Sequence, residues 1–216
     1  MGNRDDREAA VNAPPVVGGD ISLTASGLAW PDGRVITHGR AGLTNQRTPL
    51  QERGQALMAL TLELGRLISG GASTAVLGAP DGPQWPALVL VEHFASRAAG
   101  IDPERAYVWW SLINYLGRND VPVIAVPPSS VKLYACGMGN ANKREVIAGV
   151  REWFPQFEIR RTSKTGKILT TDDDNKADAV ALVAMGMDLL GQPLVELPAK
   201  HRKALDALEL PPGVRL

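Results

Sequence analysis

The chain has 216 residues, of which 44% are hydrophobic and 21% charged, and its 23 basic residues equal its 23 acidic residues. These values are typical of a globular domain, and they exclude a collagen-like chain, a wholly disordered chain and a polycation that coats nucleic acid. Neither a membrane-spanning apolar run nor a secretory signal is found, so we expect no membrane partner. A single cysteine, Cys136, excludes an internal disulfide and indicates a reducing compartment.

The first part of the chain is predicted to be a polar arm followed by a β-meander. Residues 1–15 are polar and end in two prolines, which favours a disordered arm. Apolar residues that alternate with other residues over 16–30 predict one strand that turns into a second. A Pro-Asp-Gly turn at 31–33 then predicts a third strand over 33–40.

Helices and strands are predicted to alternate through the rest of the chain. Leucines near helical spacing predict an amphipathic helix over 50–69, and the Gly- and Pro-rich stretch 70–86 is typical of a loop insertion. Continuous apolar runs predict buried strands at 86–94 and 121–126. Further helices are expected at 103–117, 128–135, 142–154, 174–190 and 198–208. This order predicts an α/β fold with a mixed sheet and helices on both faces.

Three acidic residues stand at separate positions in these elements. Asp20 ends the first strand, although a turn aspartate would have the same pattern, and Glu92 follows the apolar run at 88–91, although a solvent-facing strand end would explain it equally. Asp178 lies inside the last long helix, and Asp174 and Asn175 share its helical face because they precede it by four and three positions. Carboxylate oxygens are the ligands that Mg²⁺ prefers, so this set favours a divalent-metal nuclease.

Five segments of the chain resemble, in the same order, motifs of the RuvC-type Holliday junction resolvases of the RNase H-like superfamily. They are GGDISLTASG (18–27), LVEHF (90–94), PSSVK (128–132), GMGNANKREV (137–146) and DNKADAVAL (174–182). The resemblance implies an RNase H-like, RuvC-like nuclease domain over residues 16–195, with a five-stranded mixed sheet and helices on both faces. A short C-terminal helix and tail are then expected over 196–216. Segments 41–50 and 70–86 are insertions that make this chain a divergent member.

The resemblance also implies four acidic ligands for two Mg²⁺ ions, with Mn²⁺ as a substitute. Asp20, Glu92 and Asp178 match three of them. The fourth ligand, usually Asp or His in the family, corresponds to Asn175, which can bind through its amide oxygen but adds no negative charge. We expect Asp174, one residue earlier, to be the fourth catalytic acid. If neither Asp174 nor Asn175 serves, activity should be weak or absent.

Contact with DNA is implied by the resemblance and favoured by local charge. Lys132 and Lys143 match lysines that approach DNA phosphates. Residues 132–167 carry eight basic side chains against three acidic ones, a net charge of +5. We predict that residues 160–167 form a flexible basic loop that contacts DNA; the alternative is a plain surface loop. Phe94 is predicted to contact the DNA, although a position in the core would explain this residue equally well. The predicted DNA contacts are Phe94, Lys132, Gly139, Asn140, Lys143, Arg144, Arg160, Arg161, Lys164 and Lys167.

The resemblance implies a homodimeric, metal-dependent crossover junction endodeoxyribonuclease that acts in a bacterial or phage-infected host cytoplasm. Each subunit would nick one of two opposed strands of a four-way junction, or of another branched DNA in a divergent member, and leave a 5′-phosphate and a 3′-hydroxyl. Asn175 favours one alternative, a junction-binding protein that has lost catalysis. An actin-like or sugar-kinase-like ATPase is a weaker alternative, because this chain has about half the required length and no second Gly-rich phosphate motif.

Overall fold

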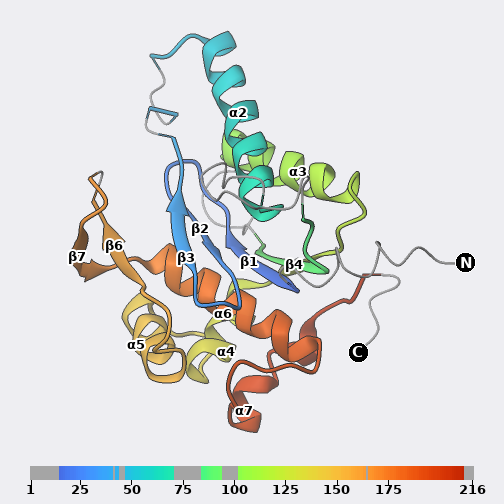
Figure 1. The fold of residues 1–216 in the computed structure, drawn as a ribbon, viewed down its shortest axis with the longest axis vertical. Helices are drawn as coiled ribbons and strands as arrows, with labels where there is room; N and C mark the ends of the chain where they lie inside the picture. The colour runs from blue at the N-terminus through green and yellow to red at the C-terminus, as the bar shows by residue number, and fades with distance from the viewer. Residues whose placement is uncertain are drawn as a thin grey trace, which may run out of the picture.

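The computed structural model describes residues 15–40, 42–43, 47–70, 84–93, 102–163 and 165–211. A five-stranded sheet with the strand order β3-β2-β1-β4-β5 lies at its centre, and a separate two-stranded sheet pairs β6 with β7 (Figure 1). Residues 1–14 of the predicted arm, Phe94 and Lys164 lie outside the described residues. So do residues 71–83 of the predicted loop at 70–86, together with part of the insertion at 41–50.

The central sheet is mixed, as the order of the predicted elements indicated. Its strands are β1 (Val16–Asp20), β2 (Ser26–Ala29), β3 (Val35–His38), β4 (Leu88–Glu92) and β5 (Val123–Val126). The first three form an antiparallel meander, whereas β4 pairs in parallel with both β1 and β5. The predicted meander and mixed sheet are therefore confirmed.

The helices begin and end close to the predicted residues. They are α2 (Leu50–Ile68), α3 (Pro103–Gly117), α4 (Pro128–Cys136), α5 (Lys143–Trp153), α6 (Asp174–Leu189) and α7 (Ala199–Arg202), with a 3₁₀ turn at Leu205–Ala207. The predicted C-terminal helix at 198–208 is thus divided between α7 and the 3₁₀ turn. In the described part of the chain, none of the helices has the length and apolar character needed to cross a membrane.

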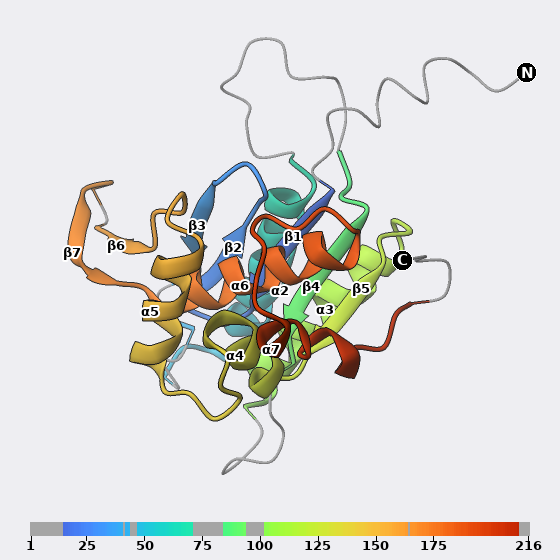
Figure 2. The same cartoon turned by 90° about the horizontal axis from the view of Figure 1, so that it is seen from below.

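Helices cover both faces of the central sheet, as predicted (Figure 2). Side chains of a strand point alternately to its two faces. Val17, Val89 and Val91 belong to a core with α2 and α3, whereas the neighbouring Val16 and Leu88 belong to a second core with α4, α5 and α6. The sheet therefore separates two cores, each with its own layer of helices.

Strand register places two acidic residues on the same face. In the parallel pair β1–β4, Val16 lies opposite Leu88 and Gly18 opposite Leu90. Because side chains on one face recur every second residue, Asp20 and Glu92 continue these two rows on the face covered by α6. Both are the last residues of their strands, so their carboxyl groups project at the same edge of the sheet.

Glycines allow α6 to approach the sheet closely. A Cβ atom on Gly18 would lie 2.3 Å from the carbonyl oxygen of Ala179, and one on Gly27 would lie 2.0 Å from that of Asn175. Both contacts are with helix backbone, which cannot move aside as a side chain can. The two glycines thus bring the N-terminal half of α6, including Asp178, against the ends of β1 and β2.

The predicted flexible loop at 160–167 is wrong in part, because it begins a β-hairpin. Strand β6 (Arg160–Thr162) pairs antiparallel with β7 (Ile168–Asp172). The turn between them is closed by a hydrogen bond from Ser163 N to Lys167 O of 2.8 Å and includes Gly166 at φ +82°. Charge density indicated a loop, whereas the Ile-Leu-Thr-Thr run that follows has the residue types that favour a strand.

Candidate metal and DNA site

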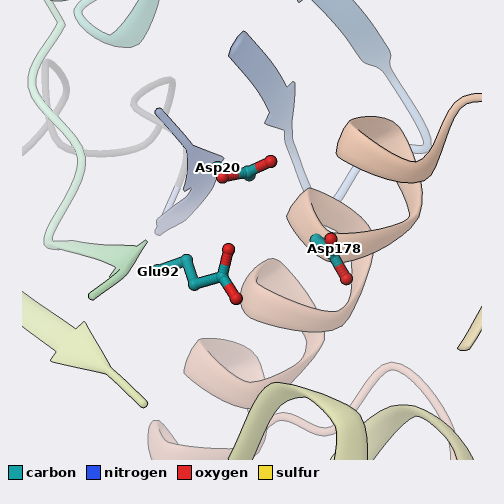
Figure 3. Close-up of side chains that lie close together, drawn as sticks. All are labelled: Asp20, Glu92 and Asp178. Atoms are coloured by element: carbon teal, nitrogen blue, oxygen red, sulfur yellow. The ribbon is translucent and has the colours of Figure 1, made fainter. Parts of the chain in front are cut away.

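Three carboxyl groups meet at the edge of the sheet where β1 and β4 end. Asp20, Glu92 and Asp178 each offer an oxygen, and these oxygens all lie within 4.8 Å of one another (Figure 3). Asp20 comes from β1, Glu92 from β4 and Asp178 from α6. Residues far apart in the sequence, each predicted as a metal ligand, are therefore brought together by the fold.

Burial and mutual repulsion disfavour negative charge on these groups. Burial raises the pKa of Asp20, and the nearby charge of Arg105 only partly opposes this. Burial, followed by the charges of Asp20 and Asp178, raises the pKa of Glu92 to about 8. Burial and the charges of Asp20 and Asp174 raise the pKa of Asp178 to about 7. A divalent cation among them would supply the positive charge that full ionisation requires.

The donor set fits a hard divalent cation. Asp20 Oδ1 is buried, and no hydrogen bond reaches it from the residues that the structure describes. The nearest basic group is Arg105 Nη2, at 3.6 Å, while Arg105 Nε donates to the carbonyl oxygen of Ile21 at 3.0 Å. A buried carboxylate oxygen without a donor, beside two further carboxyl groups, is the type of oxygen site that Mg²⁺ or Mn²⁺ occupies.

Asp174 lies beside this cluster but is held by two cations. It forms an ion pair with Lys143, and Arg161 Nη2 lies 3.7 Å from its Oδ1. Burial acts to raise the pKa of Asp174, but the hydrogen bond from Lys143 and the charges of Lys143 and Arg161 outweigh it and leave the pKa below its ordinary value. Asp174 is not one of the three carboxyl groups within 4.8 Å, so its role as fourth ligand stays a prediction.

The side-chain amide nitrogen of Asn175 is engaged in a hydrogen bond with the backbone. Its Nδ2 donates to the carbonyl oxygen of Ala25 at 2.5 Å, which joins the start of α6 to the loop before β2. Asp173 caps the helix by accepting from Asn175 N at 3.2 Å, and it also accepts from Thr37 Oγ1 at 2.8 Å. Asn175 nevertheless lines the same pocket as Asp174.

A pocket of about 330 Å³ opens over the three carboxyl groups. Besides the acids, its lining includes Lys132 from α4, Lys143 from α5 and Arg105 from α3. Lys143 is the first residue of α5, whose start is stabilised by a capping box between Asn142 and Glu145. Basic groups from three helices thus stand around an acidic floor, as a phosphodiester and its metal would require.

The predicted DNA contacts Gly139 and Asn140, between α4 and α5, and Arg144, in α5, do not line this pocket. Asn140 and Arg144 are exposed. Gly139 is half-buried, and a Cβ atom there would lie 3.3 Å from the carbonyl oxygen of Ser129, which is a tight contact. The structure therefore gives these residues access to a partner without placing them at the acids.

Among the basic side chains of the hairpin, that of Arg161 lies next to the first residue of α6. Arg160 pairs with Glu158, and Arg161 Nε donates to the carbonyl oxygen of Asp172 at 3.1 Å. Lys167 is exposed in the turn before β7. Arg161 lies beside the carboxyl group of Asp174, so the base of the hairpin adjoins the pocket.

Two polar lining residues, Arg105 and Ser22, were not predicted from the sequence. Arg105 lies in the first turn of α3, after the N-cap Asp102 and Pro103, so its local pattern indicates only a helix start. Ser22 Oγ accepts from Ala25 N at 3.0 Å, which is typical of a turn. Ser22 lies near Asp20 because it follows it by two residues, whereas the nearness of Arg105 to Asp20 depends on how α3 packs and has no local signal in the sequence.

No protein-family model and no curated protein sequence match the chain, whereas solved structures do. Thermus thermophilus RuvC is 24% identical with a TM-score of 0.49, and it covers 82% of this chain and 96% of its own. T. thermophilus RuvC in complex with Holliday junction substrate is 22% identical with a TM-score of 0.50 and the same coverage. The yeast mitochondrial Holliday junction resolvase Ydc2 is 14% identical with a TM-score of 0.45, covering 95% of this chain and 88% of its own.

The fold expected from the motifs agrees with the observed sheet order and with the helices on both faces of the sheet. It also agrees with the similarity to T. thermophilus RuvC in complex with Holliday junction substrate. The mixed sheet expected from the motifs is present with its acids at the expected strand ends. The chain therefore has a divergent form of the RNase H-like fold of the RuvC-type Holliday junction resolvases.

Proposed function

We propose that this chain is a metal-dependent endonuclease that cleaves branched DNA, with the four-way junction as its principal substrate. The observation that carries the proposal is the group of three carboxyl groups, Asp20, Glu92 and Asp178, at the floor of a pocket with basic walls. Acids alone would repel a phosphodiester, and basic residues alone would only bind it. The two together are suited to phosphodiester hydrolysis.

The basic residues hold and orient the DNA backbone. Lys132 and Lys143 reach the pocket from two different helices, so they can contact phosphate oxygens on either side of the scissile bond. Arg105 Nε donates a hydrogen bond to the carbonyl oxygen of Ile21. This bond orients the guanidinium group so that Nη2 faces Asp20 and the pocket. These contacts fix the position of the phosphate and carry no information about base sequence.

Asp20, Glu92 and Asp178 would hold the metal, with Asp174 as the fourth ligand and Asn175 as its alternative. When bound there, Mg²⁺ or Mn²⁺ supplies a nucleophilic water at neutral pH and neutralises charge on the phosphate, and a pair of ions would support both the attacking and the leaving oxygen. Hydrolysis forms a bond from the water oxygen to phosphorus and breaks the bond from phosphorus to the 3′ oxygen. The products are a 5′-phosphate and a 3′-hydroxyl.

Protons held by the acids couple metal binding to pH. With a pKa of about 8 for Glu92 and about 7 for Asp178, these carboxyl groups retain protons near neutral pH before a cation binds. Cation binding must displace these protons, because only ionised carboxylates are effective ligands. The activity should therefore increase from slightly acidic to slightly alkaline pH.

A homodimer would match the symmetry of a four-way junction. Two active sites related by a two-fold axis would nick two opposed strands at equivalent positions. The RuvC-type fold and the sequence motifs support this assignment, and so does the similarity to T. thermophilus RuvC in complex with Holliday junction substrate. We also propose that the protein acts in the cytoplasm of a bacterial or phage-infected cell.

The test is an incubation of the purified chain with an end-labelled mobile four-way junction and with a linear duplex of the same sequence. Each reaction contains Mg²⁺, Mn²⁺ or EDTA, and Asp178→Asn serves as the variant. The expected result is paired, symmetric nicks in the junction that require metal and are lost in the variant.

Other outcomes separate the alternatives. Tight junction binding without nicks in any metal would contradict the enzyme proposal and favour a junction-binding protein. Equal cleavage of flaps, forks and junctions would retain the chemistry and remove the preference for junctions. Stabilisation by ATP without cleavage would favour the actin-like or sugar-kinase-like ATPase.

A further inference from the structure

The β6–β7 hairpin is a basic, exposed ribbon that also carries apolar side chains. All three residues of β6 and the first four of β7 are exposed. Ile168 is 46% exposed and Leu169 38% exposed, directly after the turn. Adjacent residues of a strand point to opposite faces, so each face of the ribbon presents one of these apolar side chains. Exposed apolar groups beside basic ones indicate a contact surface.

The base of the hairpin is attached firmly to the helix that carries Asp178. Lys176 of α6 is buried, and its Nζ donates to the carbonyl oxygen of Arg160 at 2.8 Å and to Thr162 Oγ1 at 3.2 Å. Asp173 N donates to the carbonyl oxygen of Ile159 at 2.8 Å. The hairpin therefore has a fixed position relative to the catalytic carboxyl groups, although its outer part is exposed.

Charge favours DNA as the occupant of this ribbon. Arg160, Arg161 and Lys167 are exposed on the hairpin or in its turn. Glu158 pairs with Arg160, whereas Asp172 pairs with Arg151 of α5. The threonines of β7 add hydroxyl groups suited to phosphate or sugar oxygens. A protein partner of acidic character would match the charge, but it would not explain why the ribbon adjoins an acidic pocket lined by Lys132 and Lys143.

We propose that this hairpin recognises the branch of the DNA substrate, with Ile168 and Leu169 packing against base faces that a branch leaves unstacked and the basic residues contacting phosphates. This inference rests on the proposed function and extends it by assigning branch selectivity to an element outside the acidic pocket. Isoleucine and leucine are among the side chains that proteins insert between base steps. A continuous duplex keeps its bases stacked, so the same side chains gain little from it.

The reach of the hairpin agrees with this role. Arg161 at its base lies 3.7 Å from Asp174, one helical turn before Asp178. The four residue-to-residue steps from Asp172 to Ile168 span about 13 Å of strand. Since successive base pairs are about 3.4 Å apart along the helix axis, the apolar pair would contact DNA a few base pairs from the phosphate in the pocket.

The experiment compares the wild-type chain with the double variant I168S/L169S, which changes only exposed side chains. A double variant on α2, L50S/M58S, is the control, because Leu50 and Met58 are 83% and 55% exposed and lie on a different element. Binding of a four-way junction and of a linear duplex is measured in EDTA, which prevents cleavage. A 2-aminopurine base at the branch reports unstacking by its fluorescence, and nicking of the junction with Mn²⁺ is followed in parallel.

The expected result for I168S/L169S is junction binding weakened about tenfold with duplex binding within about twofold of wild type. The fluorescence increase at the branch should be lost, and the control should behave as wild type. Equal loss of junction and duplex binding, an unchanged fluorescence increase, or the same effect in the control would overturn the inference. If the wild-type chain nicks junctions and the hairpin variant keeps full selectivity, only this inference fails, whereas a wild-type chain without branch preference or nicking overturns the proposed function as well.

Discussion

Lys143, the first residue of α5, forms an ion pair with Asp174, the first residue of α6. One side chain is expected to contact a DNA phosphate, and the other is expected to bind metal. The hydrogen bond to Asp174 raises the pKa of Lys143, so the lysine stays protonated. Because a phosphate would compete for the same ammonium group, DNA binding should free Asp174 for the cation.

Asp174→Asn should weaken Mn²⁺ binding by about tenfold, the equivalent of 1.4 kcal/mol, whereas Asn175→Ala should change it by less than about threefold. The charge of Asp174 already raises the pKa of Asp178, so it acts on the site, while the amide of Asn175 is engaged with Ala25. Titration calorimetry in the Lys143→Gln background, in which Asp174 is no longer paired with Lys143, measures both. A larger effect of Asn175→Ala would identify Asn175 as the fourth ligand. Lys143→Gln should strengthen Mn²⁺ binding, because it releases Asp174.

Stability without metal should fall as pH rises, and Glu92→Gln should reduce that fall. The pKa of Glu92 is raised from 4.5 to about 8 in the folded chain. The contribution of Glu92 to the free energy of unfolding is therefore fully present below pH 4.5 and is lost as pH approaches 8. At 1.36 kcal/mol per pKa unit, and allowing for partial solvation, the loss is roughly 2–4 kcal/mol. Thermal melting in EDTA from pH 5 to 8.5 measures it as a decrease in Tm of about 5–10 °C for wild type.

Asp178 keeps part of the pH dependence in that variant, because burial and the charges of Asp20 and Asp174 raise its pKa to about 7. Mn²⁺ at pH 8 should restore much of the wild-type Tm, since the cation stabilises the ionised carboxylates. Equal pH slopes for wild type and Glu92→Gln would show that Glu92 ionises at its ordinary pKa.

Gly18→Ala should separate α6 from the sheet and abolish cleavage. The added methyl group would lie 2.3 Å from Ala179 O and 2.4 Å from Val183 N, so the helix must shift and carry Asp178 away from Asp20. We expect a loss of about 1–3 kcal/mol in the free energy of unfolding, measured in urea. Gly54→Ala in α2 is the matched control, because nothing lies within 4 Å of its added methyl and it should stabilise by about 0.5–1 kcal/mol. A Gly18→Ala chain with wild-type stability and nicking would disprove the close approach.

Lys176→Met should loosen the β6–β7 hairpin without removing a carboxyl group of the Asp20, Glu92 and Asp178 cluster. Methionine keeps most of the aliphatic stem but cannot donate to Arg160 O and Thr162 Oγ1. We expect a destabilisation of about 1–3 kcal/mol and faster amide hydrogen exchange in β6 and β7. Exchange in the central strands β1 and β4, corrected for global stability, is the internal control. Unchanged protection of the hairpin would mean that its position does not depend on Lys176.

Local patterns in the sequence determined the strands of the central sheet, the helices and the places of the three clustered acids. Apolar alternation and apolar runs predicted the meander, β4 and β5, and the Asp20 and Glu92 positions followed because each acid comes at the end of its run. Asp178 was identifiable because a carboxylate inside an apolar helix needs a reason to be there. These signals depend only on periods of 2 and 3.6 residues, which neighbours along the chain specify.

Only the tertiary structure decided which other groups face these acids. Arg105 reaches Asp20 because α3 packs across the sheet edge, and Lys143 meets Asp174 because α5 begins beside the start of α6. Residues 160–167 were predicted as a loop, whereas they begin the β6–β7 hairpin, whose strands pair with each other and are almost fully exposed, so no apolar alternation marks β6. Contacts of this kind join residues that are distant along the chain, and they depend on helix packing and on glycines such as Gly18 that permit it, so no local pattern could specify them.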